Sequence, residues 1–242
     1  MSNEEDNSMP RTNASDVVAM VARSGLGAVP LVGAALAEIV TVLIPNQRSA
    51  RVEAYVKALA ERLEGVVARA DALDLADPWK IDLFEEGAFQ SARAVSDQRR
   101  DYIVSVVARG LSGEQIAVAD AKSILWILRE LDERQLVILV GYLPQNGWNS
   151  EYRRLHADVF ETSMPLTMGT PQEEVSKRTY YNHAVDGLVT LKLLNEIFRV
   201  DDLKMAKLDH NGKPEVSRRV LSRLGAEVLF YLGFEVKREH HY

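Results

Sequence analysis

Residues 24–45 (SGLGAVPLVGAALAEIVTVLIP) constrain the fold more than any other segment, because Glu38 is their only charged residue. Pro30 suits a first helical turn and Pro45 ends the segment, which predicts a helix of about 22 Å over residues 31–44. A bilayer core is about 30 Å thick, so burial within the protein is the favoured interpretation. The side chains expected in the main core are Leu31, Leu36, Ile39 and Leu43.

Two alternatives remain open for residues 24–45. The segment could touch or enter a membrane, although Glu38 would then cost a few kcal/mol in mid-span. It could also form a surface for a partner protein. Gly33 and Ala37 have a small-xxx-small spacing, which allows close helix contact both in a protein core and in a membrane.

The composition is that of a globular protein and excludes several classes of site. The chain has 242 residues, of which 47% are hydrophobic and 26% charged. It contains no cysteine, which excludes disulfides, thiolate zinc sites and cysteine nucleophiles. The net charge of −6 argues against a general nucleic-acid-binding protein. The acidic N-terminus is unlike a secretory signal, so a cytoplasmic location is expected.

Hydrophobic periodicity predicts a helical bundle of about six or more helices over residues 14–163, after a disordered tail at 1–13. The clearest signal covers residues 47–75, where apolar residues recur at spacings of three and four. A second long helix is predicted over residues 79–110. Shorter helices are expected at 112–130, 132–141 and 151–160.

The predicted helix 79–110 carries the densest group of charged residues in the chain. Four polar side chains would share one face of a continuous helix: Glu86, Gln90, Arg93 and Asp97. This candidate polar cluster could bind a partner or a polar ligand, but solvated pairs on a helix surface explain it more simply.

Residues 164–171 are predicted to form a linker into a C-terminal module at 172–242. A helix is predicted at 172–198, then strands at 203–208 and 215–221 around the hairpin dipeptide Asn211-Gly212. Ser222 would cap a final apolar helix. This order resembles the wing and last helix of a winged-helix module. The predicted fold class is therefore mainly α, a helical bundle with a small C-terminal α/β winged-helix-like element containing a β-hairpin.

The winged-helix resemblance raises the question of DNA binding. Residues 171–242 hold 12 Lys and Arg against 11 Asp and Glu, whereas phosphate contacts need clustered cations. The local cluster near the wing consists of Arg218, Arg219 and Arg223. Neighbouring strand residues point to opposite faces, so Arg218 and Arg219 would not act together. Nucleic-acid binding is therefore not the favoured function.

No catalytic, cofactor-binding or metal-binding site emerges from the sequence. The five histidines lack the helical spacing of a zinc site. His183, beside Tyr180 and Tyr181, is the histidine of most interest, although structural hydrogen bonding is the simpler interpretation. There is neither a phosphate-binding loop nor a Gly-x-Ser-x-Gly motif.

Three classes of function follow from these patterns. The favoured class is a non-enzymatic interaction or scaffold protein whose C-terminal module docks to a protein partner or to a second copy. The alternatives are a membrane-acting effector that exposes residues 24–45 and a winged-helix transcriptional regulator.

Overall fold

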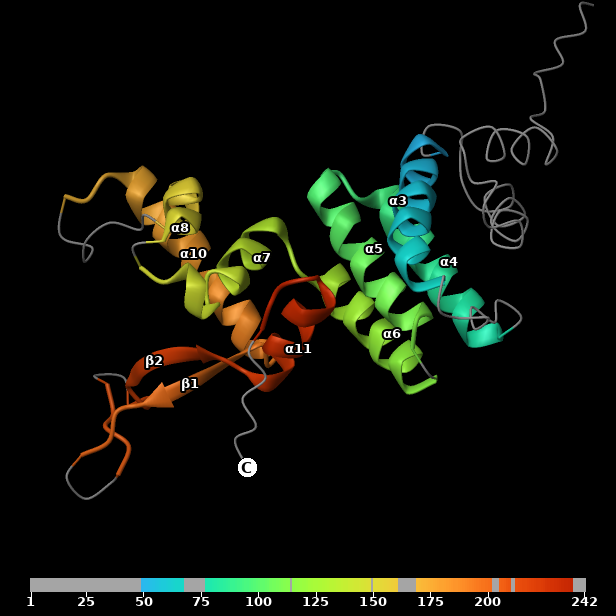
Figure 1. The fold of residues 1–242 in the computed structure, drawn as a ribbon. Helices are drawn as coiled ribbons and strands as arrows, with labels where there is room; N and C mark the ends of the chain where they lie inside the picture. Colours follow the sequence, from blue (N-terminus) through green and yellow to red (C-terminus); the bar gives the residue numbers. More distant parts are fainter. Residues whose placement is uncertain are drawn as a thin grey trace, which may run out of the picture. The chain divides into compact units, whose positions relative to one another are not determined.

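The computed structural model describes residues 49–67, 77–113, 115–148, 150–160, 169–201, 205–209 and 212–236. These residues are mainly helical, with a small antiparallel hairpin in the C-terminal region (Figure 1), which confirms the predicted fold class at this level. The chain forms two compact units, one ending at Leu125 and the other beginning at Trp126.

Several predictions lie outside the described residues and stay predictions. They concern the tail at 1–13 and most of the linker at 164–171. They also include the stretch 24–45 with its expected core residues Leu31, Leu36, Ile39 and Leu43. Within the described ranges, no helix has both the length and the apolar character needed to cross a membrane.

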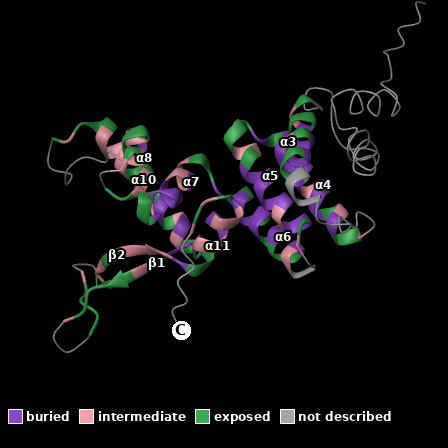
Figure 2. Cartoon of the chain, in the orientation of Figure 1, coloured by how far each residue is buried: buried purple, intermediate pink, exposed green. Residues whose placement is uncertain are grey.

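The first unit packs α3 (Ser49–Val67), α4 (Pro78–Arg93) and α5 (Asp97–Leu111) against one another, and it includes the start of α6 (Gln115–Glu130). The buried residues line the facing sides of these helices (Figure 2). The predicted period of α3 is confirmed where the structure describes it, because its apolar positions are all buried: Val52, Val56, Leu59 and Leu63.

The predicted continuous helix 79–110 is wrong, because the chain breaks between α4 and α5. Helix α4 ends at Arg93, and its C-cap Ala94 has an extended backbone. Ser96 then caps α5, its Oγ accepting a hydrogen bond from the Arg99 N–H. No Gly or Pro marks this break, so the capping serine followed by Asp97 was the only local signal for it.

The second unit contains α7 (Glu133–Val140), the 3₁₀ turn η3 (Pro144–Asn146), α8 (Glu151–Leu155), α9 (Ala157–Phe160) and α10 (Gln172–Thr190). Helix α7 begins at a capping box between Asp132 and Gln135. The unit ends with strands β1 (Leu194–Phe198) and β2 (Val216–Leu221) and with helix α11 (Arg223–Tyr231), which Ser222 caps as predicted.

The predicted helix 172–198 is wrong at its C-terminal end. Helix α10 stops at Thr190, and Lys192 has a φ of 61°, which does not continue a helix. Leu194–Phe198 instead form β1, which pairs antiparallel with β2 from Leu194–Leu221 to Phe198–Val216. The predicted returning strand is thus confirmed as β2, but it pairs with β1. The described part of the predicted strand 203–208 contributes two isolated bridges, at Ala206 and Leu208.

The far end of the hairpin divides into two short arms that meet in a ring of backbone hydrogen bonds. The Arg199 N–H donates to the Glu215 carbonyl (2.8 Å), the Glu215 N–H to the Lys207 carbonyl (2.7 Å), and the Lys207 N–H to the Arg199 carbonyl (2.9 Å). One arm follows the Val200–Ala206 bridge and the other the Leu208–Pro214 bridge. We call the three linked residues the backbone ring.

Each arm is closed by an aspartate in the same way. Asp201 Oδ1 accepts from the Met205 N–H (2.9 Å), and Asp209 Oδ1 accepts from the Lys213 N–H (2.9 Å). The backbone N–H groups of both aspartates donate in return to the carbonyls of Met205 and Lys213. The second arm turns at Gly212, whose φ of 76° suits glycine. The hydrogen bonds that close the two arms therefore repeat at a spacing of eight residues.

Candidate interaction surface on the C-terminal hairpin

The structure separates the members of the predicted polar cluster. Glu86, Gln90 and Arg93 lie on α4, whereas Asp97 is the first residue of α5, so the four side chains do not share one helix face. Gln90 is buried and donates through Nε2 to Glu86 Oε1 (2.8 Å) and to the Leu125 carbonyl of α6 (3.1 Å). Gln90 thus ties α4 to α6, which is a structural role.

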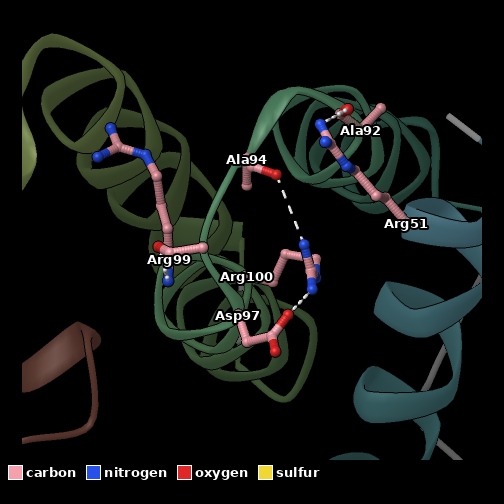
Figure 3. Close-up of polar contacts among 7 residues, drawn as sticks. Arg51, Ala92, Ala94, Asp97, Arg99 and Arg100 are labelled. Carbon is pink, nitrogen blue, oxygen red and sulfur yellow. Dashed lines mark hydrogen bonds and ion pairs between the residues drawn. The ribbon is translucent and has the colours of Figure 1, made fainter.

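The remaining charges of this region stabilise the break between α4 and α5 (Figure 3). The Arg51 guanidinium donates to the Ala92 carbonyl (3.3 Å), and Arg100 donates to the Ala94 carbonyl while pairing with Asp97. These carbonyls belong to the end of α4, where helical partners run out. Arg93 stacks its guanidinium on the Phe89 ring, 3.8 Å from the ring centre. We therefore assign these charged side chains a structural role at the junction of α4 and α5.

The predicted cation cluster Arg218, Arg219 and Arg223 is divided as well. Arg219 pairs with Glu196 across the hairpin (2.9 Å) and with Asp186 of α10 (3.7 Å). Arg218, by contrast, is exposed and lies opposite Ile197. Arg223 is exposed at the start of α11. Arg219 is therefore an anchor of the hairpin, and Arg218 remains available on its surface.

A group of aromatic and cationic side chains surrounds this anchor. Burial raises the pKa of Tyr142 above its ordinary value of 10.0, and so does the nearby Tyr181, while Arg219 and Arg153 act in the opposite direction. Burial likewise raises the pKa of Tyr181, against the effect of the same two arginines. Arg153 itself donates to the carbonyls of Asn146 (3.1 Å) and Gly141 (3.3 Å). The group joins α8, α10 and β2.

These two tyrosines should make the folded protein sensitive to alkaline pH. A phenol whose pKa is raised by folding stabilises the folded state below about pH 10, and this contribution is lost as the pH rises through the raised value. In a titration followed at 295 nm, part of the tyrosine absorbance of the folded protein should lag behind that of urea-unfolded protein. Tyr142→Phe and Tyr181→Phe should each remove part of the lag. Coincident folded and unfolded titration curves would contradict the prediction.

The base of the hairpin is held firmly by backbone contacts. Ser222 Oγ donates to the Lys192 carbonyl (2.6 Å), and the Ser222 N–H donates to the Leu193 carbonyl (3.0 Å). Leu193 and Leu194 are buried, and Gly225 of α11 lies directly against the Leu193 carbonyl. The hairpin is therefore fixed to the helices of its unit at one end.

The distal part of the hairpin is unlike its base, because no described residue between positions 195 and 221 is buried. Five of its apolar side chains are 41–65% exposed. A short hairpin without a core is marginally stable by itself, and neighbouring exposed apolar residues often mark an interaction site. We call this set the distal apolar surface: Ile197, Phe198, Val200, Met205 and Leu208. It occupies both faces of the hairpin, because Ile197 and Phe198 are neighbours in β1 and point to opposite sides.

The structure does not place His183, the histidine of most interest in the sequence, in a binding site. His183 is exposed on α10. Where side chains are described, no group of three or more His, Asp or Glu is arranged to hold a metal ion. The sequence analysis placed Ile197 and Phe198 in the predicted helix 172–198 and so missed the distal apolar surface. The β-branched and aromatic residues of Ile197-Phe198-Arg199-Val200 were the available signal.

Comparisons with known proteins identify no relative. No protein-family model matches the chain, and neither a curated protein nor a solved structure matches it significantly. The assignment of function therefore depends on the geometry of the chain.

Proposed function

We propose that this protein is a non-enzymatic interaction protein whose C-terminal hairpin docks onto a partner protein. The observation that carries the proposal is the contrast within the hairpin, with an anchored base and an exposed distal apolar surface. Covering five partly exposed apolar side chains would favour association, at about 25 cal/mol for each Å² of apolar surface removed from water. A rigid base reduces the conformational entropy lost on binding.

The order of elements supports a second candidate, a winged-helix transcriptional regulator. Helices α7, α8 with α9, and α10 precede the β1–β2 hairpin and α11, which resembles the order of a winged-helix module. DNA binding would leave the distal apolar surface without a role, so a protein partner is the preferred occupant. The membrane-acting alternative concerns residues 24–45, outside the described ranges, and it stays a prediction, as does the cytoplasmic location.

Site-specific photo-crosslinking tests the proposed docking. A benzophenone amino acid at Phe198, in the full chain expressed in its source cells, should give a discrete protein adduct. The same crosslinker at Val95, which is 85% exposed in the first unit, should not give this adduct. Adding Leu208→Asp should abolish the Phe198 adduct, because a charge at the distal apolar surface opposes its burial.

Two results would contradict this proposal. Equal adducts from Phe198 and Val95 would indicate random collision. An adduct at Phe198 that survives Leu208→Asp would show that the distal apolar surface does not determine binding.

A further inference from the structure

The described carboxylates of the hairpin are all engaged within the fold, whereas only some of its cations are. Glu196 pairs with Arg219, and Glu215 pairs with Arg199 at 2.7 Å. The two remaining described carboxylates, Asp201 and Asp209, accept the backbone N–H groups that close the arms. Every described carboxylate of the hairpin is thus committed to the fold of the hairpin.

The cations around the distal apolar surface are differently placed. Within the described ranges, no carboxylate forms an ion pair with Lys207, Lys213 or Arg218, and all three side chains are exposed. Lys207 lies between Ala206, which belongs to the first arm, and Leu208, which belongs to the second. Arg218 of β2 lies opposite Ile197 of β1. The distal hairpin therefore presents apolar and positively charged groups together.

These observations point to the chemistry of the partner. Resting on the docking function proposed above, we infer that the distal hairpin binds an acidic segment of a partner protein, in which apolar side chains alternate with Asp or Glu. Its apolar residues would cover Phe198, Met205 and their neighbours, and its carboxylates would pair with the three cations. Complementary charge of this kind mainly sets specificity and the rate of association.

A second copy of this chain fits the hairpin poorly. A two-fold axis places the same surface on both sides of an interface. Antiparallel pairing of β2 with β2 about its centre would set Arg218 opposite Arg219, and pairing of β1 with β1 would set Glu196 opposite Glu196. Like charges directly opposite each other destabilise a sheet, and charged residues at strand edges commonly prevent such pairing.

Nucleic acid also fits less well than an acidic protein segment. Phosphate groups would attract the three cations. They would leave the distal apolar surface in water, since sugar-phosphate contacts are polar. An acidic segment with apolar residues satisfies both features of the surface.

Fluorescence anisotropy with the purified full chain tests the inference. The probes are three labelled peptides of equal length, in which leucine and phenylalanine alternate with glutamate, glutamine or lysine, and a short duplex DNA. The acidic peptide should bind most tightly and the lysine peptide least. Raising the salt concentration should weaken the acidic complex, since exposed charges are screened over about 10 Å at 0.1 M ionic strength.

The variants separate charge from folding. The triple variant Lys207→Glu, Lys213→Glu, Arg218→Glu should weaken binding of the acidic peptide by about tenfold or more, through loss of charge complementarity. The matched control Lys57→Glu, Arg62→Glu, Arg154→Glu changes exposed cations elsewhere and should keep wild-type affinity. If the glutamate triple variant loses its circular dichroism spectrum, the corresponding glutamine triple replaces it and should also weaken binding.

Three outcomes would overturn the inference. They are equal affinity for the three peptides, no binding of any peptide, and preferential binding of duplex DNA that the triple variant abolishes. If any of these occurs while the Phe198 adduct depends on Leu208, docking stands and only the acidic chemistry fails. If that adduct is absent as well, the docking function fails with it.

Discussion

Tyr55→Ala should lower the free energy of unfolding of the first unit by about 3–5 kcal/mol, as expected when a large buried aromatic side chain is truncated. The Tyr55 ring is fully buried on α3 and lies 5.6 Å from the Phe84 ring of α4. It also fills the space beside Gly87, where a Cβ would lie 2.5 Å from the Tyr55 hydroxyl. Removing the ring leaves a cavity between two helices. Urea denaturation followed by circular dichroism measures the effect.

Tyr55→Phe is the matched control, because it keeps the ring and removes only the hydroxyl. The Tyr55 hydroxyl donates to the Phe84 carbonyl (3.3 Å), so this variant should lose about 1 kcal/mol. Equal and small losses for the alanine and phenylalanine variants would show that the Tyr55 ring does not hold α3 to α4.

Gly225→Ala should destabilise the second unit by about 3 kcal/mol, although alanine normally favours a helix over glycine by about 1 kcal/mol. A Cβ at Gly225 would lie 2.3 Å from the backbone carbonyl of Leu193, next to the base of the hairpin. A backbone atom cannot rotate away as a side chain can, so α11 and the hairpin must separate. Thermal unfolding of the variant followed by circular dichroism measures the loss.

Gly147→Ala provides the comparison within the same unit. Its nearest neighbour would be the Pro144 carbonyl at 3.8 Å, and its φ of −60° suits any residue. This variant should unfold at the wild-type temperature. Equal melting temperatures for the two alanine variants would contradict the proposed close contact between α11 and Leu193.

Local signals in the sequence predicted those elements whose boundaries depend on nearby residues. The capping residues Asp132 and Ser222 mark the starts of α7 and α11, and the period of α3 needs only its own apolar residues. Strand β1 was predicted as helix because Leu194 and Ile197 also fit a helical spacing. Pairing with β2 decides between the two periods, and that partner lies about twenty residues away.

The distal apolar surface was less predictable from the sequence, because it consists of side chains that the rest of the folded chain does not bury. The sequence identified Arg218 and Arg219, but only the fold shows that Glu196 and Asp186 engage Arg219. Arg153, Tyr142 and Tyr181 come together from separate segments, and no local motif links them. Burial is a property of the assembled chain, so an exposed apolar residue such as Phe198 looks in sequence like a core residue.

The backbone ring at the end of the hairpin holds the two arms together through main-chain groups, whereas the side chains on the arms determine what the arms can bind. Arg199, Lys207 and Glu215 complete the ring through N–H and carbonyl groups, which every residue except proline supplies. Except for Asp201 and Asp209, whose carboxylates close the arms, side chains on the arms can therefore change over evolutionary time while the outline of the arms is kept. Such a platform can acquire a new partner by substitution of a few surface residues, without redesign of the fold beneath it.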